Sequence, residues 1–497
     1  MSGLGQLLRA EWTKLRTVPG WIGGVLAAAA VIVGIGLLPG MKGSCGQHGP
    51  GSECVLPVGP DGELVSDHFF FVHRPLAGDG TITVRVTALT GLLPARPGEP
   101  AGTRPGVAPW AKAGLIVKDG TRVGSAYAAV MVTGSHGVRM QDDYTHDIAG
   151  SPGPVSASAP RWLRLTRSGD TVTAAESDDG TAWTTVGSAH LPGLPSIVQV
   201  GLFATSPQYA ETIHESGMSG SYGGPTQVTA VFDHVTPDGA WTGEAVGDAS
   251  GVPAGNVERA GGRFTVTGSG DIAPAVTGAA GIGTTVTQTL VGTFVGLIAV
   301  IVVAALFITA EYRRGLIRTT LAATPQRGRV LAAKAVVVGS AAFAAGLAGA
   351  AVVVTLGQRV LRGNGVYVFP ATALTEVRLV VGTAALLAVT AVLALAIGAV
   401  VRRSAATVAA ALVVIVLPYL LAMTVLPTGA AQWLLRVTPA AAFAVQQSAL
   451  RYPQVSSPYT PTDGYFPLAP WAGLAVLGTW AALALGLALV QFRGRDA

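Results

Sequence analysis

The sequence predicts an α-helical polytopic membrane protein of about six transmembrane helices, with one all-β sandwich domain inserted between the first and second helices. Half of the 497 residues are apolar and 12% are charged, whereas soluble domains carry charge on about a quarter of their residues. Most of the Asp, His and Pro residues lie between about residues 40 and 283, and runs of Ala, Val, Leu and Gly flank that stretch. The chain therefore joins a membrane part to a polar part.

Six segments are apolar over a length that can cross a hydrocarbon core of about 30 Å, which takes about 20 residues of helix. None carries a charged residue near its middle, where one costs about 2.5–3.5 kcal/mol. The first segment is too long for a typical signal peptide, so we expect it to remain as an anchor. The predicted spans are residues 21–38, 287–310, 330–356, 377–401, 405–426 and 471–490.

The distribution of Lys and Arg in the short connections predicts the orientation. If the N-terminus is cytoplasmic, that side carries Arg9, Lys14, Arg16, Arg313, Arg314, Arg318, Arg327, Arg329, Lys334, Arg402, Arg403, Arg493 and Arg495. The short loops on the other side carry Arg359, Arg362, Arg378, Arg436 and Arg451. We therefore expect both termini in the cytoplasm and the insertion, residues 39–286, outside it.

Residues 1–20 are expected to form a cytoplasmic amphipathic helix that ends at Pro19 and Gly20. A basic tail that only orients the chain is the alternative. The apolar positions are Leu4, Leu7, Leu8, Trp12 and Leu15. Cys45 and Cys54 lie just outside the first span, where an oxidising compartment favours a disulfide over two free thiols.

The insertion reads as short strands with period-two alternation and turn residues between them, which predicts a two-sheet sandwich over residues 64–235. Residues 236–286 are expected to be a strand pair and linker. The predicted strands are residues 81–86, 115–117, 127–133, 138–141, 162–167, 171–176, 198–205, 230–235 and 264–267.

The sandwich resembles the concanavalin-like, jelly-roll family of lectin and glucanase domains. The resemblance rests on WLRLTRSGDTVTAAESDDGTAW at residues 162–183, VQVGLFATS at 198–206 and AVFDHV at 230–235. It implies a jelly-roll fold and a glycan as a further partner. Because the matching residues are mainly strand and turn positions, we expect Trp162 and Trp183 to be core aromatics rather than platforms for a sugar ring.

Sequence motifs of catalysis are absent. The chain has no G-x-x-x-x-G-K-[ST] phosphate loop, no H-E-x-x-H, no G-x-S-x-G and no Cys/His cluster with zinc spacing. A glycosidase would need paired carboxylates, but acidic residues at turns usually bind local backbone. The available acids are Asp142, Asp143, Asp147, Glu176, Asp178, Asp179, Glu211 and Glu215. We expect no enzyme and no metal site, and the net charge of +5 follows the spans rather than a nucleic-acid surface.

The polar segment EYRRGLIRTTLAATPQRGRVLAAK, residues 311–334, is similar to the cytoplasmic segment between spans two and three in membrane subunits of type-two ABC transporters. LRAEWTKLRT at residues 8–17 is similar to the N-terminal helix of the same family. On this resemblance, the residues that couple the chain to an ATPase are Glu311, Arg313, Arg314, Gly315, Arg318, Pro325, Arg327 and Arg329, with Lys334 at the start of the next span.

The residues themselves predict a surface helix from Glu311 to about Thr324 that ends at Pro325. A positive-inside loop without a coupling role is the alternative. Residues 430–450 are apolar with interspersed Gln and Arg, which favours a re-entrant or interfacial helix pair over a span.

The resemblance implies an exporter permease in the bacterial cell membrane, acting as a homodimer or heterodimer with a nucleotide-binding subunit. That subunit, rather than this chain, would hold ATP and Mg²⁺. The competing functions are a membrane-anchored glycan-binding receptor and a membrane-tethered glycosidase. An anchor needs one span only, so the 311–334 segment favours transport.

Overall fold

The structure is a computed structural model that describes residues 3–38, 56–215, 218–247, 255–277, 283–316, 326–455, 457, 459–461 and 464–494. In this part of the chain six helices are long and apolar enough to cross a membrane, which confirms the predicted number of spans. They are Pro19–Gly36, Val286–Arg313, Arg327–Gly363, Ala373–Val401, Ser404–Thr424 and Pro470–Gln491. The all-β region lies between the first and the second, as the sequence predicts.

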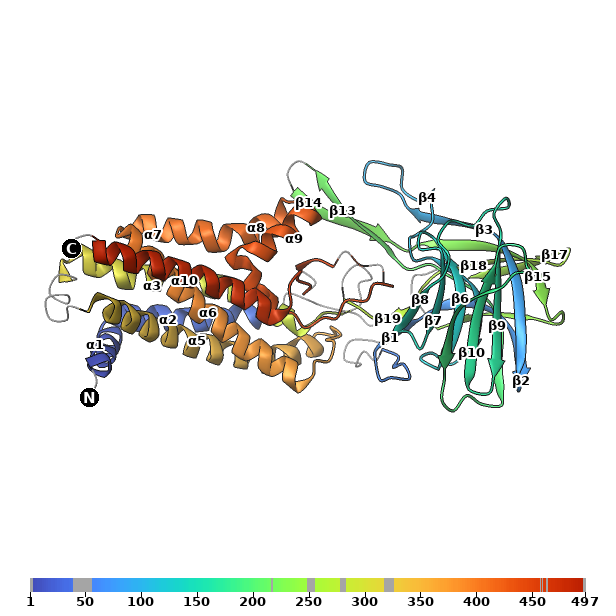
Figure 1. The fold of residues 1–497 in the computed structure, drawn as a ribbon, viewed down its shortest axis with the longest axis horizontal. Coiled ribbons are helices and arrows are strands. Elements are labelled where there is room, and N and C mark those ends of the chain that lie inside the picture. Colours follow the sequence, from blue (N-terminus) through green and yellow to red (C-terminus); the bar gives the residue numbers. More distant parts are fainter. Residues whose placement is uncertain are drawn as a thin grey trace.

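The molecule is elongated, with the helical bundle at one end and the sandwich at the other (Figure 1). Both chain ends lie at the end of the bundle that is remote from the sandwich, which we call the terminal end (Figure 1). The opposite end of the bundle is the sandwich end.

In the described residues, the bundle consists of α-helices and three shorter irregular helical segments. The helices are α1 (Gly3–Thr17), α2 (Pro19–Gly36), η1 (Val286–Leu290), α3 (Thr293–Arg313), α5 (Arg327–Gly363), α6 (Ala373–Val401), α7 (Ser404–Ala411), η2 (Leu412–Val416), α8 (Leu417–Thr424), α9 (Thr428–Val437), η3 (Pro439–Gln446) and α10 (Pro470–Gly494). One span is therefore composite, because α7, the π-helical η2 and α8 follow one another. Pro418 lies at the start of α8 and lacks the backbone N–H that a regular helix would use there.

Small residues let the spans approach closely. A Cβ on Gly346 of α5 would lie 2.9 Å from Ala384 Cα of α6, and one on Gly296 of α3 would lie 2.6 Å from a side-chain carbon of Ile32 in α2. Lipid tails are as apolar as the side chains, so association of helices depends on such close packing. The Gly/Ala-rich composition of the spans is thus a packing requirement as well as a membrane signature.

The segment expected to be a re-entrant or interfacial pair is α9 followed by η3. α9 is amphipathic and exposes Trp433, whereas every residue of η3 is buried, against α6 and α10. A buried 3₁₀ segment at this depth is tolerated because protein surrounds it. The sequence-based expectation of a non-spanning helical pair therefore agrees with the structure.

Two antiparallel sheets form the sandwich. Sheet one has the order β11-β10-β9-β3-β15-β18-β17, with β4 added to β3, and sheet two has the order β16-β2-β12-β5-β6-β7-β8. The strands of sheet one are β3 (Gly80–Pro94), β4 (Thr103–Pro105), β9 (Arg161–Ser168), β10 (Thr171–Ser177), β11 (Thr184–His190), β15 (Gln227–Thr236), β17 (Asn256–Ala260) and β18 (Arg263–Gly268). Those of sheet two are β2 (Phe69–Ala77), β5 (Lys112–Lys118), β6 (Tyr127–Thr133), β7 (Val138–Asp142), β8 (His146–Ala149), β12 (Ile197–Thr205) and β16 (Thr242–Val246).

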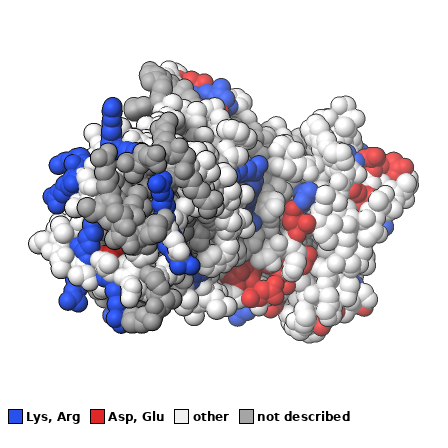
Figure 2. Space-filling view, turned by 60° about the vertical axis from the view of Figure 1, so that its left-hand side comes forward, with Lys and Arg blue, Asp and Glu red and all other residues white. Residues whose placement is uncertain are grey.

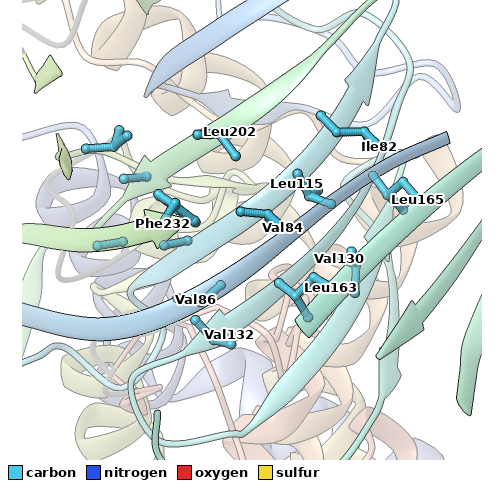
Figure 3. Packing of buried hydrophobic residues seen from close by; sticks show 14 of the residues in the cluster. Ile82, Val84, Val86, Leu115, Val130, Val132, Leu163, Leu165, Leu202 and Phe232 are labelled. Carbon is cyan, nitrogen blue, oxygen red and sulfur yellow. The ribbon is translucent and has the colours of Figure 1, made fainter. Parts of the chain in front are cut away.

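The core between the sheets consists of the inward residues of each alternating strand. Figure 3 shows side chains from both sheets meeting there, among them Val84, Leu163 and Phe232 from sheet one and Leu115 and Val130 from sheet two. All five are fully buried. The period-two pattern in the sequence predicts this core because alternate side chains of a strand point to one face.

The sheets extend beyond residue 235, where the sequence analysis places the end of the sandwich. β16 joins sheet two and β17 and β18 join sheet one, so the segment expected to be a strand pair and linker supplies three strands of the sandwich among its described residues. The predicted hairpin of residues 162–167 and 171–176 is present as β9 and β10. A further hairpin, β13 (Tyr209–Glu215) and β14 (Met218–Gly224), leans from the sandwich toward α8 (Figure 1).

Sheet two is also buried on its outer face. The strands β1 (Val65–Asp67) and β19 (Ile272–Pro274) pair with each other and lead the chain into and out of the sandwich. A second apolar cluster fills the space beneath them, with Phe71, Ile116 and Phe203 at 0% exposure. The two attachments of the sandwich therefore lie side by side, as an insertion into another domain requires.

Two lysines at the ends of β5 hold the β1–β19 strand pair in place. Lys118 Nζ lies 2.8 Å from Asp67 Oδ2, and Lys112 Nζ lies 2.8 Å from Asp271 Oδ1; both lysines have 0% exposure. Tyr144 Oη also donates to Asp67 Oδ2, over 2.8 Å. Burial lowers the pKa of Lys118 and the carboxylate of Asp67 opposes this shift. The sandwich is thus closed around a buried polar network that holds the lead-in strand.

Candidate functional site

The N-terminal helix α1 packs across the terminal end of the bundle. Its buried face consists of Leu8, Glu11 and Leu15, which are spaced three and four residues apart and pack against α5 and its neighbours. Leu4 and Trp12 are exposed, 40% and 48% respectively. The expected amphipathic helix is present, and its single acidic residue, Glu11, is buried.

Four charged side chains from three helices meet beneath α1. We call Glu11 and Lys14 of α1, Glu311 of α3 and Lys334 of α5 the charge cluster. Lys334 Nζ lies 2.5 Å from Glu11 Oε1 and 2.5 Å from Glu311 Oε1. Lys14 Nζ also contacts Glu311 Oε1, and it lies 4.0 Å from Glu11 Oε2. Each lysine therefore joins α1 to a span, or one span to the other.

The charge cluster is almost completely shielded from solvent. Lys334, Glu311 and Glu11 are 1%, 3% and 6% exposed, and their charges cancel with that of Lys14. Both ammonium groups also lie over the ring of Phe307, at 4.7 Å for Lys14 and 5.6 Å for Lys334. Such charges are stable in an apolar interior only when paired. The geometry therefore makes the position of α1 depend on the positions of α3 and α5.

Lys14 is the least buried member of the cluster, and its ammonium lies outside the spans. Burial, reinforced by the neighbouring ammonium of Lys334, lowers the pKa of Lys14 to about 8. One oxygen on each carboxylate, Oε2 of Glu11 and of Glu311, has no hydrogen-bond donor. The cluster thus has two carboxylate oxygens free to accept a hydrogen bond, and one ammonium, that of Lys334, that both carboxylates share. A small movement of one helix could therefore exchange one ion pair for another without breaking all of them.

The expected surface helix from Glu311 to Thr324 is not what the described residues form. Glu311 lies in the last turn of α3, which continues to Arg313, and its side chain points into the bundle. Gly315, with φ +68°, follows the end of α3 and adopts a conformation that favours glycine. The apolar spacing of Phe307 and Ile308 continues the span through Glu311, and the buried lysines compensate the charge. Residues 317–325 lie outside the described residues.

The other predicted coupling residues surround the cluster without entering it. Arg313 and Arg314 are exposed at the end of α3, and Arg327 and Arg329 form the first turn of α5. Arg318 and Pro325 lie outside the described residues. Figure 2 shows Lys and Arg side chains gathered at this end of the bundle. Arg402 and Arg403 of the α6–α7 turn belong to the same end.

Sequence reasoning missed the partners of Glu311. Glu11 and Lys14 stand in the N-terminal helix as apparently ordinary surface charges. The available signal is that Glu11 shares the helical face of Leu8 and Leu15, at spacings of three and four. A carboxylate on an apolar helical face indicates a buried partner elsewhere in the chain.

The acids considered for glycoside hydrolysis bind local groups in the sandwich. Asp179 accepts from the backbone of Thr181 and Ala182, which lowers the pKa of its carboxyl. Glu176 accepts from Ser151 N over 2.7 Å. Others pair with bases: Asp142 with His146, Asp147 with Arg139 and Asp178 with Arg161. Asp143 accepts from Tyr127 N, Glu211 from Tyr209, and the side chain of Glu215 lies outside the described residues.

Trp162 and Trp183 are not core aromatics, so that expectation is wrong. Neither belongs to the core cluster, and both are only partly buried. Arg85 lies over the Trp162 ring at 5.6 Å and Arg164 lies over the Trp183 ring at 3.6 Å. The rings are outward-facing because Trp162 precedes the inward Leu163 in β9, and the arginines cover them. The expected disulfide of Cys45 and Cys54 lies outside the described residues.

Comparison with known proteins gives one family match, which begins in β7 of the sandwich and continues to the end of the chain. A family model described as "ABC-2 family transporter protein" matches residues 141–497, well over half of the chain. A search of curated proteins gives no match.

Solved structures resemble only part of the chain. A functionally unknown protein from Saccharomyces cerevisiae is 17% identical over 34% of this chain and 74% of its own, with a TM-score of 0.21. Scytalido-glutamic peptidase with a transition state analog inhibitor is 9% identical over 41% of this chain and 98% of its own, with a TM-score of 0.26. At these TM-scores neither likeness carries an argument about this chain.

Proposed function

This chain belongs to the ABC-2 transporter family, and we propose that it is the permease subunit of an ABC exporter that a separate nucleotide-binding subunit drives. The observation that carries the proposal is the charge cluster. Glu311, in the segment that resembles the coupling region of such permeases, is joined by buried ion pairs to α1 and α5. A displacement applied at the terminal end would therefore move three helices together.

The exposed arginines at the ends of α3 and α5 supply a surface on which a soluble partner could act. Arg313 and Arg314 lie two and three residues after Glu311, and Arg329 lies five residues before Lys334. A partner with an acidic surface would pair with these arginines and push on α3 and α5. ATP and Mg²⁺ would be held by that partner.

We propose that two permeases form the complete membrane unit, as a homodimer or a heterodimer. The composite span of α7, η2 and α8 supports this, since only 28% of its apolar window is buried within one chain. Its exposed residues include Val413, Leu417 and Leu420. A second permease or lipid must cover such a face.

We further propose that the protein lies in a bacterial cell membrane with the terminal end in the cytoplasm and the sandwich outside. The basic residues at the terminal end support this orientation through the positive-inside rule (Figure 2). The all-β region resembles concanavalin-like domains. The glycan-binding alternative gains no support from the described residues, because the outer face of sheet two is covered and arginines lie on Trp162 and Trp183.

The orientation predicts the outcome of accessibility labelling. In cells, cysteine introduced at Asp178, which is exposed on the sandwich, should react with a membrane-impermeant maleimide. Cysteine introduced at Arg403 should react only after the membrane is permeabilised. Replacing Cys45 and Cys54 by serine first gives the labelling a clean background. The reverse labelling pattern would refute the orientation.

Charge reversal tests the coupling surface. Arg313→Glu with Arg314→Glu should weaken binding of the nucleotide-binding subunit by tenfold or more, because close charged pairs across an interface couple by about 1.5–7 kcal/mol. Transport should fall while insertion, checked by the labelling above, is retained. Arg359→Glu, an exposed arginine at the sandwich end of α5, is the matched control. Unchanged partner affinity and transport in the double variant would remove these arginines from the coupling surface.

A further inference from the structure

The sandwich is docked onto the membrane part through the loop that joins η3 to α10. Gln454 of this loop donates from Nε2 to the backbone oxygen of Thr145 over 3.0 Å and to that of Tyr144 over 3.4 Å. The side chain is buried, with the residue 3% exposed. A buried amide with two backbone acceptors fixes position as well as contact.

Apolar contacts surround this hydrogen bond. Val455 of the loop packs on Ala273 and Val276, which follow the sandwich as the chain leaves it, and Tyr452 packs against the same group. Tyr459 Oη donates to the backbone oxygens of Tyr452 and Val455, so the docked turn is held in shape from its own side. The loop is therefore an organised interface.

The turn of the sandwich that receives Gln454 is strained and strongly anchored. Asp143 and Tyr144 both have positive φ, +40° and +65°, although neither is glycine. The Tyr144 hydroxyl is tied to Asp67 Oδ2, and Asp143 Oδ1 accepts from Tyr127 N. Non-glycine residues keep such conformations only where the surroundings enforce them, and they concentrate at sites with a mechanical or binding role.

A second link connects the exit of the sandwich to the α5–α6 loop. Thr284 N donates to Tyr367 O over 2.8 Å, and Phe369 N donates to Thr284 O over 2.9 Å. The chain directly before η1 is thus fastened to the α5–α6 loop at the sandwich end of the bundle.

On its other side, the docked loop continues directly into the hydrogen-bonded end of η3. Gln446 Nε2 donates to Thr293 Oγ1 of α3 and to Thr383 Oγ1 of α6, over 3.1 and 3.0 Å. Thr287 donates to Gln446 O and lies 2.7 Å from Ser448 Oγ. The hydrogen bonds of Gln446, which hold η3 between the spans, are therefore close in sequence to those of Gln454, which hold the loop on the sandwich.

We propose that the sandwich is a built-in regulator of the position of η3. It holds the loop around Gln454, and through that loop it holds η3 in its place against α3, α6 and α10. A change in the position of the sandwich would therefore displace η3 at the sandwich end of the bundle. The proposal rests on the transport function proposed above, because only a transporter needs η3 to move.

Hydrogen exchange in the full chain, in lipid nanodiscs, tests the link without requiring transport. Gln454→Ala should speed exchange of the η3 amides, residues 440–446, by about tenfold, the size expected for loss of a buried hydrogen bond. Gln326→Ala, the same change at the terminal end, where the side chain is exposed and caps nothing, should leave η3 unchanged. Equal η3 exchange in both variants and in the original chain would overturn the proposal.

A crosslink tests the same contact by fastening the loop to the sandwich, whereas Gln454→Ala loosens it, and the crosslink does not risk unfolding. In a chain with Cys45→Ser and Cys54→Ser, Thr145→Cys and Gln454→Cys are joined by a short bis-maleimide. The crosslink should slow η3 exchange and lower transport by the assembled complex, while partner binding persists. Unchanged η3 exchange after complete crosslinking would also overturn the proposal. Slowed exchange in a complex whose uncrosslinked form does not transport would support the link and refute the transport function instead.

Discussion

Replacing Lys334 with methionine is expected to lower the free energy of unfolding by about 3–5 kcal/mol, the range measured when one partner of a buried ion pair is removed. The change leaves Glu11 and Glu311 buried without the ammonium that lies 2.5 Å from each. Methionine retains most of the side-chain volume, so the loss reports on charge rather than on a cavity. Thermal and denaturant unfolding of the detergent-solubilised protein measures it.

The matched control is the same substitution at Lys14. Its side chain is 28% exposed, and burial already lowers its pKa to about 8, so its loss should be smaller than that at Lys334. Adding Glu11→Gln to Lys334→Met removes the carboxylate that has lost its close ammonium partner, since Glu311 still contacts Lys14, and should restore part of the stability. If Lys334→Met unfolds like the original chain, the charge cluster does not hold α1, α3 and α5 together.

The second large effect is expected in the sandwich, where Asp67→Asn should also cost about 3–5 kcal/mol. Asp67 Oδ2 accepts from Lys118, Tyr144 and the backbone of Gly124, each over 2.8 Å. An amide in its place leaves the Lys118 ammonium buried with no opposite charge. Asp178→Asn is the matched control, because its side chain is 81% exposed and such surface pairs contribute about 0–1 kcal/mol.

The pH dependence of Asp67→Asn separates charge from shape. Burial lowers the pKa of Lys118 below its ordinary 10.5, and the variant loses the carboxylate that opposes this shift. The unfolded chain then binds more protons than the folded one between the lowered pKa and 10.5, so stability rises with pH in that window. The deficit of the variant should therefore shrink as the pH approaches 10. A deficit that stays constant with pH would assign the loss to packing. Circular dichroism of the β-sheet signal during heating measures the stability of the variant and of the original chain at each pH.

The strands illustrate what periodicity can predict and what it leaves out. Residues 127–133 form β6 with the predicted bounds, because their apolar content and flanking turns leave no alternative. The periodicity of the sequence does not predict β16 and β17, because edge strands of mostly exposed residues, such as Asn256–Ala260, lack an apolar face. Their pairing with sheet residues distant in sequence decides their structure.

The candidate site likewise combines a feature that the sequence predicts with features that only the fold reveals. Glu311 was identified from a segment of the sequence, but its environment was assigned wrongly, since a carboxylate before two arginines indicates a surface. Only the packing of α1 over α3 and α5 brings Glu11 and Lys14, some 300 residues away, to its side chain. Local patterns carry no information about contacts at such separations.

The sequence by itself determined the number of spans, the place of the insertion and its all-β class, because each follows from local hydrophobic length or alternation that only one environment satisfies. The tertiary structure alone decided which charges are buried, that sheet two is covered on both faces, and that Gln454 docks the sandwich on the loop before α10. These features depend on groups that are polar in sequence and become stable inside the protein only when a distant partner supplies the opposite charge or the missing hydrogen bond.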